Sequence, residues 1–307
     1  MKGFTMTDEN KLGENLTFIS GAVRYSDLIY FALQSDGIDT ALDPHFYPVT
    51  FDDGTWGADI TVEWTPVGMT VSRSPLEQMV TISENGDVYC YGSGNESFEK
   101  IACDGILPLD RGGPLRNVRN IGNRVYAVGM KRQVYRRDGR DRWVCIDGGV
   151  FSTGKEVVGF ESVDGFSEND IFAAGWEGEI WHYDGSGWAQ HDSPTNLILL
   201  DVCCGGDGNV YACGQMGTLM VGKDQVWTLV DTDLKENIWS LCWFSDTLYM
   251  AAYSGIYQLA GDHIERIDFK DDVPGTFYHL SAADGLLCSI GGKDVMGFDG
   301  RSWFRIR

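Results

Sequence analysis

The segments VYAVG (125–129), IFAAG (171–175) and VYACG (210–214) are copies of one pattern, an alternating run of apolar and small residues that ends in glycine. Related segments recur along the whole chain. Seven copies begin at Ile29, Met79, Val125, Ile171, Val210, Leu248 and Leu287, with gaps of 50, 46, 46, 39, 38 and 39 residues between their starts. A period near 40 residues is typical of β-propeller blades rather than of helical repeats.

Each copy has neighbours in a fixed order. An apolar segment such as LLDV (199–202) precedes it, and a strand with a polar turn and an aromatic residue follows, as in IWHYDGSGW (180–188). Four strands per unit result: an inner strand A, then B, C and an outer strand D. Because stacked blades bury both sheet faces, the B strands can be apolar or small throughout. The Trp residues that close these units are expected to anchor one blade on another: Trp56, Trp143, Trp188, Trp227 and Trp303.

The sequence therefore predicts an all-β fold, a seven-bladed β-propeller of four-stranded antiparallel blades, with six or eight blades as alternatives. We expect one domain over residues 1–307, with a polar segment 1–14 and blades that begin near 16, 65, 115, 158, 198, 237 and 276. Glycine after strand B is expected to permit a tight or left-handed turn. For closure, either the segment before Phe18 adds a strand or side-chain packing alone joins the ends.

The order of glycine-ended strand, aromatic residue, turn and Trp resembles kelch-type and related bacterial propeller repeats. The resemblance extends from Phe18 to the C-terminus, although only Gly291-Gly292 provides the paired glycines of that pattern. It implies the fold and little about activity, because propellers carry unrelated functions.

Composition argues against several classes of protein. The N-terminal residues are polar and acidic, unlike a secretory signal, and no apolar stretch is long enough to span a membrane. None of the eight cysteines has CxxC spacing, so we expect reduced core thiols in a cytoplasmic protein. We expect no metal and no cofactor.

Charge is distributed unevenly. The net charge is -21, yet residues 111–142 carry +8, which leaves -29 for the rest of the chain. This field disfavours nucleic acid as a partner and favours a basic protein. The basic segment predicts either a second docking patch or ion pairs with acidic neighbouring blades. The candidate residues of this second patch are Arg132, Arg136, Arg137 and Arg140.

The loops that join B to C, and D to the next A, share one face of a propeller. In blades four to seven these loops are rich in aromatic, Met and carboxylate side chains, as an interface for a basic protein would be. The predicted partner-binding residues are Trp176, Glu177, Met216, Tyr253, Asp231, Asp233, Asp271 and Asp272.

The five histidines are scattered, and the common catalytic motifs are absent from the sequence, so we name no catalytic residues. The predicted function is that of a protein-binding propeller, with an inhibitor or immunity-type protein that binds a basic partner as the specific hypothesis. One alternative is a carbohydrate-active or small-molecule enzyme with two carboxylates in the central channel. Another is a scaffold that forms a homo-oligomer by docking its basic blade on its own acidic rim.

Overall fold

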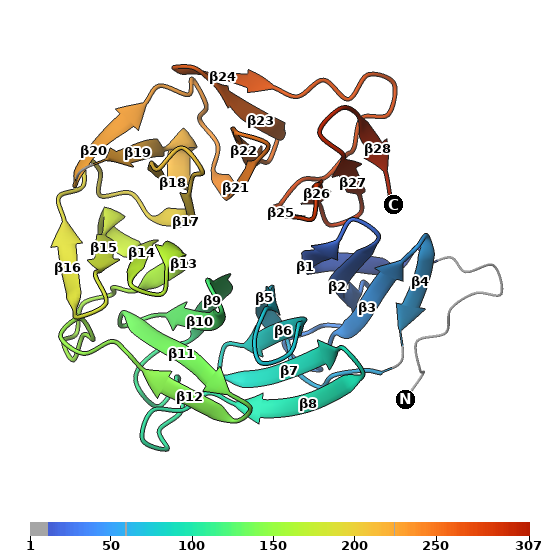
Figure 1. The fold of residues 1–307 in the computed structure, drawn as a ribbon. Helices are drawn as coiled ribbons and strands as arrows, with labels where there is room; N and C mark the ends of the chain where they lie inside the picture. The colour runs from blue at the N-terminus through green and yellow to red at the C-terminus, as the bar shows by residue number, and fades with distance from the viewer. Residues whose placement is uncertain (1–11, 59, 224) are drawn as a thin grey trace.

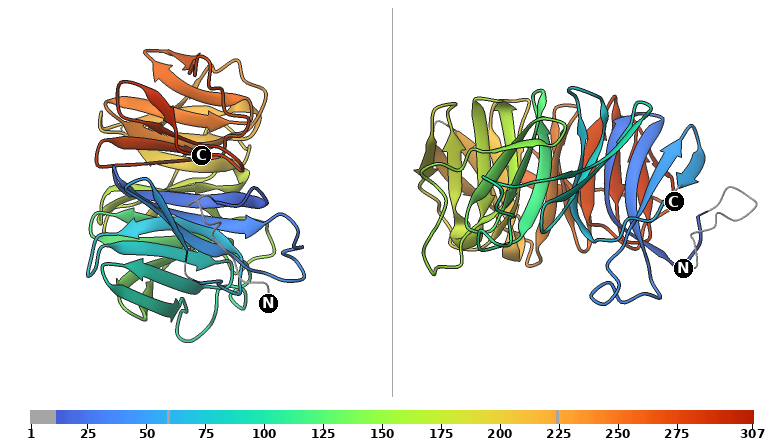
Figure 2. Two further views of the ribbon diagram at one scale, coloured as in Figure 1. Left: turned by 90° about the vertical axis from the view of Figure 1, so that its right-hand side faces the viewer. Right: turned by 90° about the horizontal axis from the view of Figure 1, so that it is seen from below.

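The computed structural model describes residues 12–307 except 59 and 224, and it forms a ring of seven four-stranded sheets (Figure 1). Seen from the side, the ring is a disc with connections on both faces (Figure 2). The helical elements in the described part of the chain are two short 3-10 turns, η1 (Trp176–Gly178) and η2 (Gln215–Gly217). The predicted all-β, seven-bladed propeller is confirmed.

Each blade takes four consecutive strands, ordered A to D from the hub outward. The first four blades are β1 (Leu16–Tyr25), β2 (Leu28–Ser35), β3 (Tyr47–Asp52) and β4 (Thr55–Ala58); β5 (Pro66–Ser72), β6 (Gln78–Ser83), β7 (Asp87–Gly92) and β8 (Asn95–Lys100); β9 (Leu115–Ile121), β10 (Arg124–Gly129), β11 (Gln133–Gly139) and β12 (Arg142–Cys145); β13 (Phe160–Ser167), β14 (Asp170–Gly175), β15 (Ile180–Tyr183) and β16 (Trp188–His191). The last three are β17 (Leu199–Cys204), β18 (Val210–Gly214), β19 (Leu219–Lys223) and β20 (Val226–Val230); β21 (Ile238–Phe244), β22 (Thr247–Ala252), β23 (Gly255–Ala260) and β24 (His263–Arg266); β25 (His279–Ala283), β26 (Leu286–Ile290), β27 (Val295–Phe298) and β28 (Trp303–Arg305).

The glycine that ends the B strand has a steric role in two of the copies that define the repeat. Gly175 and Gly214 are themselves extended, with φ of 179° and -173°. The expected tight turn begins at the next residue, and its left-handed positions are Glu177 and Met216 rather than the glycine that ends the strand. A Cβ on Gly175 would lie 2.0 Å from the carbonyl oxygen of Gly159, and one on Gly214 would lie 2.1 Å from that of Ile198. The glycine therefore lets the preceding connection lie directly against the end of strand B.

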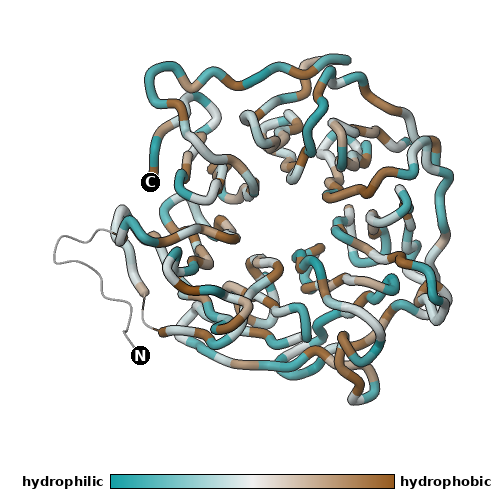
Figure 3. The backbone as a smooth tube through the Cα atoms, turned by 180° about the vertical axis from the view of Figure 1, so that it is seen from behind, coloured by the Kyte–Doolittle hydropathy of each residue, from teal (hydrophilic) through white to brown (hydrophobic). Residues whose placement is uncertain are grey.

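The core lies between blades, where apolar side chains of two adjacent sheets interdigitate. Trp143 of blade three packs with Val80 and Val88 of blade two, and Trp227 of blade five packs with Phe172 of blade four. Hydrophobic segments recur in blade after blade around the ring (Figure 3). Five Trp residues thus join the outer strands of five of the seven blades to the preceding blade: Trp56, Trp143, Trp188, Trp227 and Trp303.

A belt of hydrogen bonds near the hub also ties the blades together. In each case a side chain on one inner strand accepts the backbone N–H of the next inner strand. The pairs are Thr70 with Asn120 at 3.1 Å, Asp164 with Cys204 at 2.8 Å, Asp201 with Leu241 at 2.8 Å, Ser240 with Leu280 at 3.2 Å, and Ser281 with Val23 at 3.0 Å. Since such bonds satisfy buried backbone donors, the belt fixes the rotation of one blade against another.

The ring closes between blades seven and one without exchange of a strand among the described residues. The backbone N–H of Phe18 donates to the Gly292 carbonyl at 3.0 Å, and the Lys293 ammonium contacts Asp36 and the Leu16 carbonyl. One hydrophobic cluster spans both blades. Packing and these polar contacts therefore close the ring over the described residues, whereas most of the polar segment 1–14 lies outside them.

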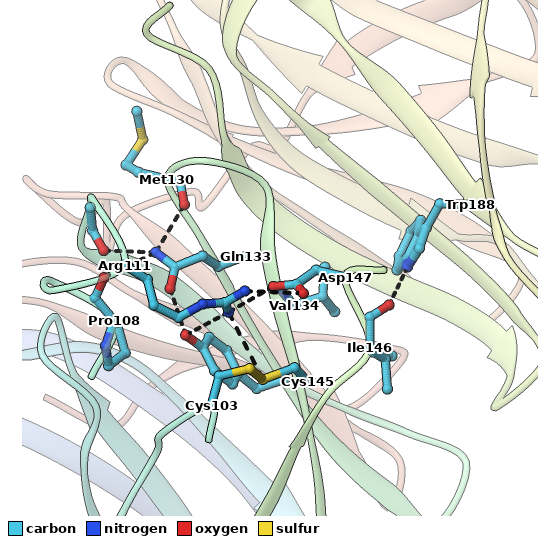
Figure 4. Close-up of polar contacts among 12 residues, drawn as sticks. Cys103, Pro108, Arg111, Met130, Gln133, Val134, Cys145, Ile146, Asp147 and Trp188 are labelled. Atoms are coloured by element: carbon cyan, nitrogen blue, oxygen red, sulfur yellow. Dashed lines mark hydrogen bonds and ion pairs between the residues drawn. A yellow bond between two sulfur atoms is a disulfide. The ribbon is translucent and has the colours of Figure 1, made fainter. Parts of the chain in front are cut away.

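Two cysteines depart from the expectation of reduced thiols. Cys103 and Cys145 form a disulfide with a Cα–Cα distance of 5.7 Å, beside the Arg111 guanidinium (Figure 4). Arg111 donates to Asp147 at 2.8 Å and to Tyr135 at 3.0 Å. The sequence could not pair these cysteines, because they lie 42 residues apart and meet only when the connection before β9 folds back on β12. The other six cysteines are free.

Candidate partner-binding face and hub

One face of the disc carries the B–C turns and the D–A connections. We call it the loop face and define it by segments 36–46, 84–86, 130–132, 176–179, 215–218, 253–254 and 291–294, together with 60–65, 101–114, 146–159, 192–198, 231–237 and 267–278. Antiparallel order places the start of every inner strand at this face as well. The N-terminal end of the described chain lies on the same side (Figure 2).

Exposed large apolar side chains are concentrated on the loop face. Leu42 is 84% exposed, Tyr253 81% and Met216 63%, and Val157 and Val273 are exposed as well. The opposite face has fewer such residues among the described positions: Tyr25, Leu76 and Phe166. The exposed apolar side chains of the loop face are spread over several of its loops, and among them only Met216 and Tyr253 lie on B–C turns of neighbouring blades, which share the connection 231–237.

Blades five and six bring several predicted site residues together. The Thr232 hydroxyl donates to the Gly217 carbonyl at 2.7 Å, which holds the loop containing Asp231 and Asp233 against the turn that presents Met216. Asp231 and Asp233 are exposed beside this turn. Exposed carboxylates therefore stand next to an exposed Met side chain on the loop face.

The other end of the 231–237 connection is held against the next B–C turn, 253–254. Glu236 accepts hydrogen bonds from the backbone N–H and the hydroxyl of Ser254, which places it directly beside exposed Tyr253. The D–A connection and the B–C turn thus form one surface at blade six.

The tips of two B–C turns have left-handed backbone. Glu177 has φ of 58° and Met216 has φ of 55°, and each is followed by a glycine with positive φ, Gly178 or Gly217. Two successive left-handed residues make a compact two-residue turn between the strands. Both Glu177 and Met216 are exposed.

The remaining predicted residues, Trp176, Asp271 and Asp272, differ in their exposure and in their polar contacts. Trp176 is partly buried and donates its indole N–H to Glu161 at 2.6 Å. Asp271 is exposed, while Asp272 accepts from Arg305 at 2.7 Å and so has part of its charge compensated. The loop face therefore brings the predicted residues to one side of the molecule, but not into one contiguous cluster of free charges.

Most arginines of the basic segment, residues 111–142, form ion pairs within the protein. Arg132 pairs with Glu179 at 2.6 Å, Arg136 with Asp138 at 2.8 Å, and Arg137 with buried Glu99 at 2.5 Å. Arg140 has no ion pair among the described residues. The ion-pair interpretation therefore describes three of the four candidate residues of the second patch. Arg137 is buried in its pair, whereas Arg136 is 30% exposed and shares Asp138 with Arg124 and Arg142.

A feature that the sequence did not reveal is a ring of side chains at the mouth of the hub. Six inner strands are shifted in register by one residue near their start, and the extra residue of each faces the central cavity. Blade seven contributes the residue just before its inner strand. We call these residues the hub ring: Ile19, Val67, Arg116, Glu161, Leu200, Trp239 and Tyr278. β-Bulges re-aim a side chain in this way and are common beside functional sites.

The cavity inside the hub has a volume of about 620 Å³, within the usual size of ligand pockets. Its carboxylates are already engaged. Glu161 accepts from Arg116 at 2.9 Å and from the Trp176 indole, and Asp201 accepts four hydrogen bonds. Burial raises the pKa of Asp164. The geometry therefore favours a structural role for these carboxylates over acid–base chemistry.

Cysteines in the cavity are also unsuited to nucleophilic chemistry. Burial raises the pKa of Cys242 to about 12, and burial raises that of Cys203 as well, so both thiols stay protonated near neutral pH.

No group of three or more His, Cys, Asp and Glu side chains in the described part of the chain is placed to hold a metal ion. No helix among the described residues is long and apolar enough to cross a membrane.

No family model matches the sequence. Several solved structures nevertheless share its architecture. The WD40 β-propeller domain of Doa1 superposes with a TM-score of 0.67 at 8% identity, covering 95% of this chain and 93% of that one. YCF48 bound to a D1 peptide superposes with a TM-score of 0.66 at 14% identity, covering 92% and 91%. At these identities the likeness shows the fold alone, and the chain is a seven-bladed β-propeller.

A curated protein is much more similar in sequence. The immune protein Tsi7 of Pseudomonas aeruginosa is 44% identical over 303 residues, which span 96% of this chain and 99% of that protein. The chain belongs to the Tsi7 family and is an immunity-type propeller protein.

Proposed function

We propose that this propeller neutralises a basic protein toxin by binding it through the loop face. The observation that carries the proposal is the clustering of exposed Met216 and Tyr253 with the carboxylates of Asp231, Asp233 and Glu236. Interfaces that bind tightly combine such apolar centres with a polar rim. The net charge of -21 would attract a basic partner at long range.

Membership in the Tsi7 family supports the proposal that the partner is a toxin. The internal pairing of Arg132, Arg136 and Arg137 supports an acidic rather than a basic docking surface. The same pairing removes most of the charge on which self-association through the basic blade would depend.

Charge reversal on the loop face tests the proposal. The partner is captured from an extract of the source organism on immobilised chain, identified, purified and titrated at low ionic strength. The double variant Asp231→Lys/Asp271→Lys is expected to lower the association rate at least about tenfold, because it removes two attractive charges and adds two repulsive ones. Both residues are exposed, so the fold should be unaffected.

The matched control is Asp27→Lys/Asp262→Lys, which changes the net charge equally but lies on the opposite face, at an A–B and a C–D turn. We expect it to change the rate by no more than about threefold through the overall field. Equal effects of the two double variants, or a captured partner that is acidic, would contradict the proposal.

A further inference from the structure

The hub ring is divided into two chemically distinct parts. Blades five, six, seven, one and two contribute the apolar side chains Leu200, Trp239, Tyr278, Ile19 and Val67 in succession around the mouth. Blades three and four contribute the ion pair of Arg116 and Glu161. The apolar arc is not packed shut: Tyr278 is 43% exposed, and the other four side chains are partly exposed.

We propose that the hub ring receives one large apolar or aromatic side chain from the tip of a partner loop. The proposal rests on the proposed function, in that the same partner covers the loop face. The Trp239 and Tyr278 rings, with centroids 5.4 Å apart, form an aromatic wall on one side of the mouth. The cavity behind it is large enough for a side chain to enter.

Charge distribution at the mouth favours an apolar tip over a cationic one. Glu161, the carboxylate of the hub ring, is 9% exposed and is already bonded to Arg116 and to Trp176. A partner cation at the mouth would therefore meet a neutralised carboxylate beside a guanidinium that is 42% exposed. The unpaired carboxylates of the face, such as Asp231 and Asp271, lie in the connections outside the ring.

The occupant that fits this arrangement is an apolar tip flanked by Lys or Arg residues, with the tip in the hub and the cations on the rim. The remaining N–H groups of Arg116 could then donate to carbonyl oxygens of the inserted loop. A central apolar anchor with charged surroundings is the usual arrangement of an interface hot spot.

The chemistry of the mouth can be tested without the partner. The full chain, with labelled Ile, Leu and Val methyl groups, is titrated by NMR with N-acetylphenylalaninamide and separately with N-acetyllysinamide. We expect the first probe to shift the methyl signals of Ile19, Val67 and Leu200 saturably, with a dissociation constant on the order of 10 mM. The absence of a saturable shift, or an equal shift with the lysine probe, would overturn the inference.

A second measurement uses the partner captured for the loop face. Leu200→Glu places a charge in the apolar arc and is expected to weaken the complex about 30-fold or more, as loss of a hot spot does. The matched control is Leu229→Glu in the same blade, since Leu229 is 57% exposed on outer strand β20. It should bind within about threefold of the wild type.

Thermal unfolding shows whether each variant is folded, and Trp239→Leu replaces Leu200→Glu if the latter is not. Wild-type affinity of the folded hub variant would overturn the inference. If Asp231→Lys/Asp271→Lys loses affinity while the hub variant retains it, the proposed function stands and the hub inference alone fails.

Discussion

Replacing Glu99 by Ala is expected to lower the free energy of unfolding by about 3 to 5 kcal/mol. Glu99 lies on outer strand β8 of blade two, and its side chain is fully buried. It receives two hydrogen bonds from Arg137 and one from the Trp143 indole, both in blade three. The substitution would leave the Arg137 guanidinium, which is 4% exposed, without its counter-charge at this blade junction.

Urea unfolding of the variant and the wild type measures this loss. The double variant Glu99→Leu/Arg137→Met should recover much of the stability, because a buried ion pair can be replaced by apolar side chains of similar size at little cost. An exposed pair serves as the control, and Lys100→Ala, which breaks the contact with Asp87, should cost less than about 1 kcal/mol. A loss below 1 kcal/mol for Glu99→Ala would show that the junction does not depend on this pair.

Replacing Asp201 by Ala is expected to destabilise the hub by a similar amount, about 3 to 5 kcal/mol. Asp201 is 4% exposed, and it accepts hydrogen bonds from Arg119 at 3.0 Å, the Ser162 hydroxyl at 2.6 Å and the Leu241 backbone N–H at 2.8 Å. These partners lie in blades three, four and six. One carboxylate therefore connects four consecutive blades, and its loss leaves buried donors unsatisfied.

Hydrogen exchange distinguishes this loss from a general softening of the fold. Amides of inner strands β9, β13, β17 and β21 should exchange faster in Asp201→Ala, while those of β1 and β25 should be less affected. The exposed control Asp27→Ala should leave all of them unchanged, because the Asp27 side chain is exposed on a turn. Uniform acceleration in every blade would contradict a local role for Asp201.

The propeller could be predicted from the sequence because each blade repeats its own local signals. Each stretch of about 40 residues contains an alternating apolar B strand, a turn with Gly or Asp and, in most blades, a closing Trp. A segment such as VYAVG therefore indicates a strand without information from distant parts of the chain. The immunity-type function was also a correct hypothesis, drawn from acidity and from the lack of catalytic motifs. The kelch-type subdivision stays a prediction.

The details that the sequence did not predict depend on distant parts of the chain. Ion pairs with neighbouring blades were one of the two alternatives for the basic segment, but the sequence could not identify Glu99 as the partner of Arg137. Nor could it pair Cys103 with Cys145, which meet only in the folded chain. The hub ring depends on β-bulges, whose register shifts leave no mark in an apolar pattern. The only hint in the sequence is Trp239, a large aromatic residue at the second position of inner strand β21, and nothing in the sequence indicates that it faces the cavity.

Hydrogen exchange of the complex between this chain and its captured partner tests the central claim most directly. The proposed function predicts slowed exchange in the loop face, above all in segments 215–218, 231–237 and 253–254. The hub inference adds protection of 276–279 at the hub mouth. Protection confined to the A–B and C–D turns, or to the outer strands, would contradict the proposed function.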